Sequence, residues 1–242
     1  MHLDDLKDKV ALVTGASRGI GRASALAFAK EGVHIIATAR NQAELNSLVE
    51  ECTALGVKAV AIPADATSAA DVDKLKEEAL NAFPQIDILV NNAGVSKYST
   101  LLGLSVEDYD WMMNTNMRST FLCTQAFVPE MIERKSGAVI VVSSQAGLNG
   151  YPGETVYCAT KFAQVGFAYA LDAEVREHNI KVCVIAPGSV RTTFAFGTGR
   201  VEGQPDLEFM MEADDVADAV VFAAAQPIKS RTILVGMRPM NE

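Results

Sequence analysis

The segment VALVTGASRGIG at residues 10–21 decides the expected fold. Its first half, Val10–Thr14, is a short apolar run of the kind that forms a strand buried on both faces. Its second half carries Gly15, Gly19 and Gly21 between this strand and an expected helix. Such a turn brings backbone N–H groups and a helix N-terminus toward a pyrophosphate. The segment therefore predicts a βα unit that binds a dinucleotide; a plain turn with glycines that pack the helix is the alternative.

The alternation of short apolar runs and longer amphipathic stretches continues along the chain. We expect further strands at residues 33–39, 57–64, 86–91, 138–144, 181–186 and 232–235, and helices at 19–30, 41–55, 68–83, 105–133, 154–177 and 213–225. This rhythm predicts an α/β fold, a single-domain Rossmann-type doubly wound parallel sheet with helices on both faces. The domain is expected to cover residues 1–242, with a mobile substrate loop at about 188–212.

The composition argues against several classes of protein. A net charge of −9 without a basic stripe speaks against a nucleic-acid partner. No apolar run approaches the length of a membrane span, and the N-terminus lacks the features of a signal peptide, so a cytoplasmic protein is expected. The four cysteines are widely spaced and the three histidines are isolated, so no metal site is expected.

A hydroxyl, a phenol and an amine follow one another at a spacing that suits acid–base chemistry. Ser144 lies thirteen residues before Tyr157, and Lys161 follows Tyr157 by one helical turn. A tyrosine titrates near pKa 10, and a nearby ammonium lowers that pKa by stabilising the phenolate. Tyr157 could then donate a proton to a carbonyl oxygen that Ser144 polarises. Ser143 is a competing hydroxyl, but the spacing favours Ser144.

The end of the second expected strand indicates which nucleotide is bound. An NAD enzyme usually carries an acid there for the ribose hydroxyls, whereas this strand ends in Arg40. The guanidinium groups of Arg40 and Arg18 could bind a 2′-phosphate, which predicts NADP(H). Two solvated loop arginines are the alternative reading.

The glycine turn, the segment Asn91-Asn92-Ala93-Gly94 and the Ser144, Tyr157 and Lys161 set occur in this order. Together they resemble the short-chain dehydrogenase/reductase family, and the overall pattern resembles its 3-oxoacyl-[acyl-carrier-protein] reductases and related carbonyl reductases. The resemblance runs from about residue 8 to the end of the chain. It implies an NADP(H)-dependent oxidoreductase that transfers a hydride between nicotinamide and a carbonyl or secondary alcohol, such as a 3-oxoacyl thioester or a small ketone.

Two alternatives stay open at the level of the sequence. Residues 234–239 depart from the glycine-rich tail usual in the acyl-carrier reductases, so a small 3-hydroxy-acid or other alcohol dehydrogenase is possible. A non-catalytic dinucleotide-sensing protein on the same fold belongs to a different class, because a fold does not fix a function.

The resemblance also implies the residues of the site. The catalytic set is Asn116, Ser144, Tyr157 and Lys161, in which Asn116 interrupts its helix and holds a water that relays protons to the lysine. Cofactor-binding residues are Gly15, Ser17, Arg18, Gly19, Ile20, Gly21, Arg40, Asp65, Ala66, Asn92, Ala93, Gly94, Tyr157, Lys161, Pro187, Gly188, Val190 and Thr192. Substrate residues are Ser144, Gln145, Tyr151, Tyr157 and Phe194, with Val95, Ser96 and Phe196 as further pocket candidates.

Substrate and assembly are predicted only in outline. The apolar segment Phe194–Phe196 favours a small-molecule carbonyl or alcohol with an apolar part. Residues 110–133 and 154–177 carry more apolar side chains than one sheet-facing stripe needs, which favours pairing of these helices in a homodimer or homotetramer. Packing under residues 188–212 could instead account for part of this excess.

Overall fold

One parallel sheet organises the chain. The computed structural model describes residues 3–203, 208–227 and 229–241. Its seven strands pair in the order β3-β2-β1-β4-β5-β6-β7, all parallel. They are β1 (Val10–Thr14), β2 (His34–Ala39), β3 (Ala59–Pro63), β4 (Ile88–Asn91), β5 (Gly137–Val142), β6 (Ile180–Pro187) and β7 (Leu234–Met237). The order reverses direction between β1 and β4, the point at which open parallel sheets bind ligands.

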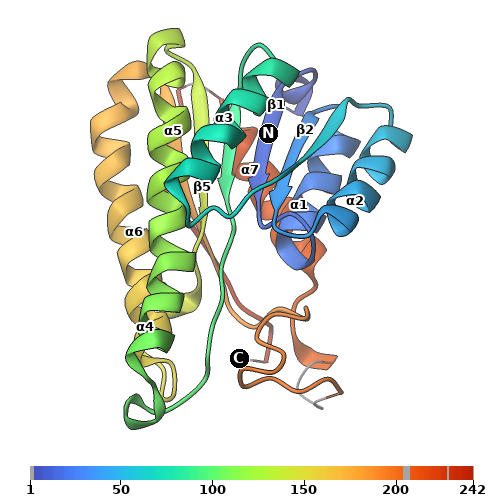
Figure 1. The fold of residues 1–242 in the computed structure, drawn as a ribbon. Helices are drawn as coiled ribbons and strands as arrows, with labels where there is room; N and C mark the ends of the chain where they lie inside the picture. Colours follow the sequence, from blue (N-terminus) through green and yellow to red (C-terminus); the bar gives the residue numbers. More distant parts are fainter. Residues whose placement is uncertain (1–2, 204–207, 228, 242) are drawn as a thin grey trace.

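Helices cover both faces of this sheet, as Figure 1 shows for α1 and α2 on one side and α5 and α6 on the other. The helices are α1 (Gly19–Lys30), α2 (Gln42–Ala54), α3 (Ala69–Ala82), α4 (Val106–Met113), α5 (Ser119–Arg134), α6 (Thr155–Val175) and α7 (Ala213–Ala224). One apolar core joins the sheet to α1, α2 and α7, and the other joins it to α3, α5 and α6. The predicted doubly wound fold is confirmed.

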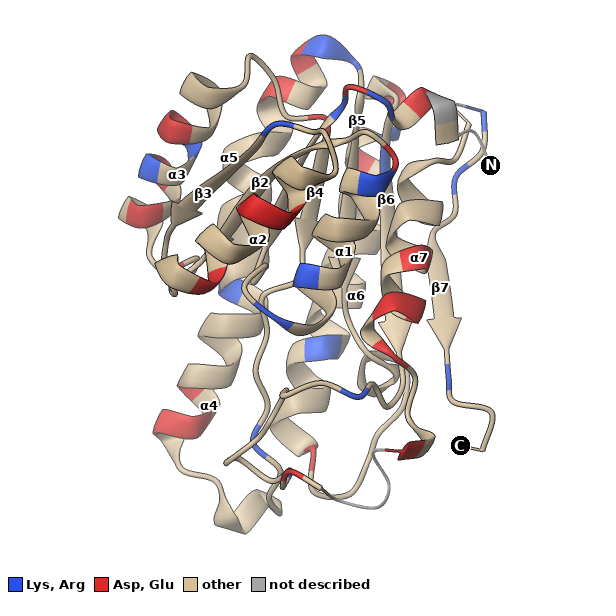
Figure 2. Ribbon diagram, turned by 90° about the vertical axis from the view of Figure 1, so that its right-hand side faces the viewer, with Lys and Arg blue, Asp and Glu red and all other residues tan. Residues whose placement is uncertain are grey.

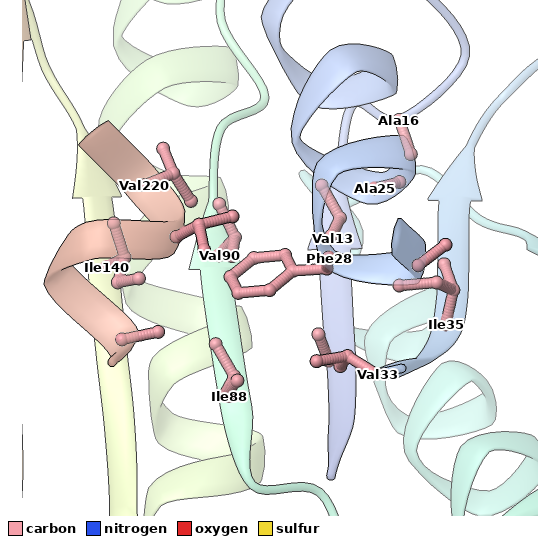
Figure 3. Packing of buried hydrophobic residues seen from close by; sticks show 14 of the residues in the cluster. Val13, Ala16, Ala25, Phe28, Val33, Ile35, Ile88, Val90, Ile140 and Val220 are labelled. Carbon is pink, nitrogen blue, oxygen red and sulfur yellow. The ribbon is translucent and has the colours of Figure 1, made fainter. Parts of the chain in front are cut away.

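The alternation of side chains along each strand creates these two cores. Ala11 and Val13 of β1 belong to the core under α1, whereas Val10 and Leu12 belong to the opposite core. Phe28 of α1 is fully buried and lies beside Val13 of β1 and Val90 of β4 (Figure 3). Burying a side chain of this size stabilises the fold by roughly 1.5–3 kcal/mol.

The single helix expected at residues 105–133 is divided in two. A π-helical turn, η3 (Asn114–Arg118), separates α4 from α5, and Ser119 N–H donates to the carbonyl of Asn114, five residues back. Asn116 inside this turn is fully buried and bonds to Val95 and Thr160, which lie far away in sequence. These tertiary contacts, rather than helix propensity, account for the interruption.

The last strand was predicted two residues too early, at 232–235. The observed β7 pairs with β6 from Val184 opposite Leu234 to Pro187 opposite Met237. Gly236 breaks the apolar pattern of the sequence, but its backbone still continues the ladder with β6. Pairing with a neighbouring strand therefore sets this boundary.

The described residues 188–203 and 208–212 are largely irregular, as the sequence predicts, apart from isolated bridges between Val190 and Met211 and between Phe196 and Arg200. Gly188 N–H donates to the carbonyl of Met237, so the segment leaves the sheet beside the last strand (Figure 1). Its mobility stays a prediction. Figure 2 shows acidic and basic residues scattered over α1, α2 and α7 without a continuous basic stripe in that view. None of the described helices is both long and apolar enough to cross a membrane.

Candidate active site

A cavity of about 670 Å³ gathers residues from the ends of most strands. The predicted residues that line it are Gly15, Ser17, Arg18, Gly19, Ile20, Arg40, Asp65, Ala66, Asn92, Ala93, Gly94, Ser144, Gln145, Tyr151, Tyr157, Lys161, Pro187, Gly188, Val190, Thr192 and Phe194, together with Val95. Gly21, Asn116, Ser96 and Phe196 are not part of this lining. Nucleotide and chemical motifs that lie far apart in sequence thus share one space.

The turn between β1 and α1 is built from glycines for steric reasons. Gly15 and Gly19 have φ of +63° and +55°, a backbone region that other residues rarely adopt. A Cβ on Gly15 would lie 3.0 Å from Cα of Ala93, and one on Gly21 would lie 2.4 Å from Nδ2 of Asn92. Gly21 therefore acts beneath the cavity by allowing the turn to pack against the end of β4.

Thr14 and Asn92 tie this turn to the middle of the sheet. The Asn92 side chain donates to the carbonyls of Thr14 (2.9 Å) and Gly15 (3.2 Å). In return, Thr14 Oγ1 accepts from the backbone N–H groups of Asn92 (2.9 Å) and Ala93 (3.1 Å). Sequence reasoning missed Thr14, although a hydroxyl at the end of an otherwise apolar strand was a visible signal.

Charged side chains border the end of the cavity at which the sequence predicts nucleotide binding. Arg18 and Arg40 are exposed, and neither forms an ion pair with another residue in the part of the chain that the structure describes. Asp65 Oδ1 accepts from Thr67 N–H (2.9 Å) and Thr67 Oγ1 (2.8 Å). The backbone bond from Thr67 is the main cause of the lowered pKa of Asp65, and Arg40 contributes a smaller effect. The lowered pKa keeps Asp65 ionised, and its Oδ1 stabilises the turn at Thr67 through these two hydrogen bonds.

Ser144, Tyr157 and Lys161 meet at the chemical end of the cavity. Ser144 lies after β5, and its Oγ accepts from Ala146 N–H (3.1 Å). Tyr157 and Lys161 are both buried on α6, with Lys161 Nζ 5.7 Å from the centre of the tyrosine ring. Burial raises the pKa of Tyr157, in contrast to the lowering that the sequence predicts, and a hydrogen bond with Ser144 acts in the opposite direction to burial. Burial also lowers the pKa of Lys161 to about 7.

Asn116 contacts both the segment after β4 and the helix that carries Tyr157 and Lys161. Its side-chain amide pairs with the backbone of Val95 through an acceptor bond of 2.8 Å and a donor bond of 2.9 Å, and it also donates to Thr160 Oγ1 (2.8 Å). Thr160 lies next to Lys161 on α6, so Asn116 joins the π turn to the helix that carries Tyr157 and Lys161. Asn114, the first residue of the π turn, lines the cavity, whereas Asn116 does not.

Two residues predicted to contact the substrate, Gln145 and Phe194, lie near Tyr157 in the cavity lining. The ring centres of Phe194 and Tyr157 are 6.0 Å apart. The Gln145 side chain donates to the carbonyl of Ala186 (2.9 Å) and accepts from Arg238 (3.0 Å), so its polar atoms are engaged by the protein. Predicted Gln145 thus borders the cavity with an anchored side chain.

Sequence reasoning missed Tyr98, Glu154 and Arg200, which also line the cavity. All three act on the pKa of Tyr157 through their charge, although burial is the larger effect. Arg200 lies in the irregular segment, and Thr198 of that segment bonds to the backbone of Ser96 and Tyr98. No sequence pattern links residues 98, 154 and 200, because only the fold brings them together.

Comparisons with known proteins agree with this geometry. The family model described as short chain dehydrogenase matches residues 9–200. The chain is 36% identical over 228 residues to a 3-oxoacyl-[acyl-carrier-protein] reductase from Synechocystis sp., covering 92% of this chain and 91% of that protein. It is 35% identical over 241 residues to a sepiapterin reductase from Chlorobaculum tepidum, covering 96% of each.

Two solved structures share the fold along almost the whole chain. An alcohol dehydrogenase from the archaeon Thermococcus sibiricus, complexed with 5-hydroxy-NADP, has a TM-score of 0.90 at 27% identity and covers 98% of each chain. A metagenomic short-chain oxidoreductase in complex with NADP has a TM-score of 0.84 at 32% identity, covering 97% of this chain and 98% of its own. With the family model and the relatives, these matches show that the chain belongs to the short-chain dehydrogenase family and is an oxidoreductase, as its motifs predicted.

Proposed function

We propose that this chain is an NADP(H)-dependent enzyme that transfers a hydride between nicotinamide and a carbonyl or secondary alcohol. The observation that carries the proposal is the shared cavity. It places the Ser144, Tyr157 and Lys161 groups in one space with the glycine turn and two arginines that have no ion-pair partner among the described residues.

The residues present fit a dinucleotide with a 2′-phosphate. Gly15 and Gly19 place no side chain at either end of the turn, and α1 begins at Gly19 with its N-terminal N–H groups available for a diphosphate. Arg18 and Arg40 supply guanidinium groups on the same lining. Two structural neighbours carry NADP or 5-hydroxy-NADP, which supports the same choice.

The residues of the chain supply the acid–base part of the reaction. Nicotinamide supplies or accepts the hydride when it is bound. In carbonyl reduction Tyr157 gives its hydroxyl proton to the substrate oxygen, while Ser144 donates a hydrogen bond to that oxygen. The ammonium of Lys161 favours the tyrosinate that remains, because an opposite charge stabilises it. The alcohol product then holds one hydrogen from the hydride and one from Tyr157.

A small ketone or a 3-oxoacyl thioester is the substrate class we favour. The reductase relative from Synechocystis sp. supports the thioester, whereas the sepiapterin reductase relative supports a smaller carbonyl compound. A small 3-hydroxy-acid or other alcohol dehydrogenase is the alternative. The presence of Ser144, Tyr157 and Lys161 in one cluster opposes a purely sensing role, which has no need of a proton donor.

Oxidation of NADPH with a panel of carbonyl compounds tests the proposal. The panel contains an acetoacetyl thioester, sepiapterin and several small ketones. Tyr157→Phe keeps the packing of the ring and removes the proton donor, so kcat on any active substrate is expected to fall by about 10²–10⁴-fold. Wild-type turnover in a folded Tyr157→Phe protein would contradict the assigned mechanism, and NADPH binding without any turnover would favour the sensing role.

We also propose a homodimer or homotetramer formed through α4, α5 and α6. Large apolar side chains on these helices remain exposed in one chain: Tyr109 (46%), Phe121 (43%), Phe162 (47%) and Tyr169 (44%). Apolar side chains at this density on neighbouring helices favour a covered face, and two-fold pairing is the common way to cover it. The expected cytoplasmic location stays a prediction.

A further inference from the structure

Gln164 is a buried polar residue that the nucleotide and substrate assignments do not use. It lies on α6 three positions after Lys161 and is 0% exposed. Its Oε1 accepts a hydrogen bond of 2.8 Å from Lys161 Nζ. Its Nε2 donates to the backbone carbonyl of Asn116 (2.9 Å) and to Thr120 Oγ1 (2.8 Å). Burying an amide is costly unless its donors and acceptor are satisfied, and here both donors and the oxygen have partners.

Gln164 thus bridges Lys161 and the backbone carbonyl of Asn116, which belongs to the π turn. The Asn116 carbonyl accepts from Gln164 Nε2 (2.9 Å) and from Thr120 Oγ1 (2.8 Å). A carbonyl oxygen has two lone pairs, so these two side chains use its accepting capacity. The family resemblance places a relay water between the asparagine and the lysine, and in this chain the Gln164 amide joins the two groups directly.

The same bridge fixes the ammonium of Lys161. Nζ donates to the carbonyl of Val142 at the end of β5 (3.0 Å) and to Gln164 Oε1 (2.8 Å). An ammonium has three donors, so one N–H remains for the cavity that Lys161 lines. Without Gln164, one protein hydrogen bond would hold the end of a flexible four-carbon side chain.

We propose that Gln164 is a positioning residue that holds Lys161 between β5 and the π turn and favours its charged form. The inference rests on the proposed role of Lys161 in the reaction. A neutral acceptor stabilises an ammonium against burial without adding a second charge to the site. An amide does not ionise, so the Lys161–Gln164–Asn116 path holds the lysine without exchanging protons with solvent.

The surroundings of Lys161 make this acceptor important. Burial lowers the pKa of Lys161 to about 7, so small changes in its partners alter its charge near neutral pH. Tyr157 on the same helix is the titratable group that faces it among the described residues. The groups from the other elements are uncharged: the Val142 carbonyl of β5, the amide of Asn116 and the backbone of Gly94.

Two substitutions are expected to move the charge equilibrium of Lys161 in opposite directions. Gln164→Leu removes the acceptor, so the midpoint of Lys161 titration should fall by about one pH unit, a tenfold change in the protonation equilibrium. Gln164→Glu places a carboxylate at the same position, so the midpoint should rise. The measurement is an NMR titration of ¹³C-labelled lysine in the cofactor-free protein, and the Lys161 signal is identified by its loss in Lys161→Met.

The pH dependence of kcat for carbonyl reduction is a second, independent measurement of the charge on Lys161. Reduction needs charged Lys161, so the alkaline limb of kcat should move to lower pH in Gln164→Leu and to higher pH in Gln164→Glu. The NMR titration requires neither substrate nor cofactor. Shifted midpoints in a protein without carbonyl turnover would therefore support the positioning role and reject the proposed reaction separately.

A matched control separates positioning from general loss of a buried bond. Thr124→Val removes a buried hydrogen bond of 3.0 Å to Asn91 on the same side of the sheet. It should lower Tm but leave the Lys161 midpoint unchanged. If Gln164→Leu does not fold, Gln164→Met removes the same amide and retains an unbranched side chain. Midpoints that stay at the wild-type value, or that move in the same direction in the acceptor-free and Glu variants, would overturn the proposal.

Discussion

Removing the guanidinium of Arg40 should change the choice between NADPH and NADH. Arg40 lines the cavity directly after β2, and Asp65 lies close enough for its pKa to be lowered by the arginine charge. In Arg40→Ala a 2′-phosphate would lose one donor group and would face the Asp65 carboxylate without its neighbouring cation. NADH carries no 2′-phosphate, so its use should change little.

The size of the effect follows from the exposure of Arg40. A hydrogen bond to a charged group contributes roughly 1.5–3 kcal/mol, which corresponds to about 10–150-fold in kcat/KM. Arg40 is exposed and Arg18 remains as a second donor, so solvent screening places the expected loss near the lower limit, at about tenfold. Raising the ionic strength should reduce the difference between wild type and variant.

The assay compares kcat/KM for NADPH and NADH with one carbonyl substrate at a fixed saturating concentration. Arg22→Ala is the matched control, because Arg22 lies on α1, pairs with Glu51 at 2.6 Å and does not line the cavity. Its cofactor preference should equal that of the wild type. A wild-type preference for NADH, or an equal loss with both cofactors in Arg40→Ala, would refute the assignment of Arg40 to the 2′-phosphate.

Two further predictions concern stability and assembly. Gly21→Ala places a Cβ 2.4 Å from the carbonyl oxygen of Gly15, so Tm should fall by about 2–10 °C, whereas Gly150→Ala, with open space around its added Cβ, should leave Tm nearly unchanged. An unaltered Tm in Gly21→Ala would contradict the packing argument. Light scattering of the wild type should give at least twice the 25.8 kDa chain mass, and Phe121→Lys should lower that mass; a single-chain mass for the wild type would exclude the pairing.

The sequence predicted those parts of the molecule whose causes are local. The β1 boundaries agree with the prediction because a compact apolar run ends at a glycine turn. The helix expected from residue 41 agrees because the Asn41 side chain caps it, accepting from Ala43 N–H (3.1 Å) and Glu44 N–H (3.3 Å). Local chemistry was sufficient in both places.

Long-range contacts explain what the sequence could not predict. The family resemblance implied the interruption of the helix at Asn116, but no local pattern predicts the contacts of Asn116 with Val95 and Thr160. The role of Gln164 is similar, because glutamine on an apolar helix gives no sign of which carbonyl or amine it will reach. Its position three residues after Lys161 was visible, but its partner in the π turn was not.

The residues proposed for the reaction lie on or next to regular elements, whereas several residues proposed for the substrate lie on an irregular segment. Tyr157 and Lys161 are buried on one helix, and Ser144 lies two residues after the end of a buried strand, so regular structure largely fixes their arrangement. Phe194 and Arg200 lie instead on the irregular segment between β6 and α7, whose conformation depends on contacts with residues near Tyr98. A change in that segment can alter the shape and charge of the substrate side without moving the proton donor. The chemistry can therefore be inferred from sequence motifs, whereas the substrate must be identified by measurement on the folded protein.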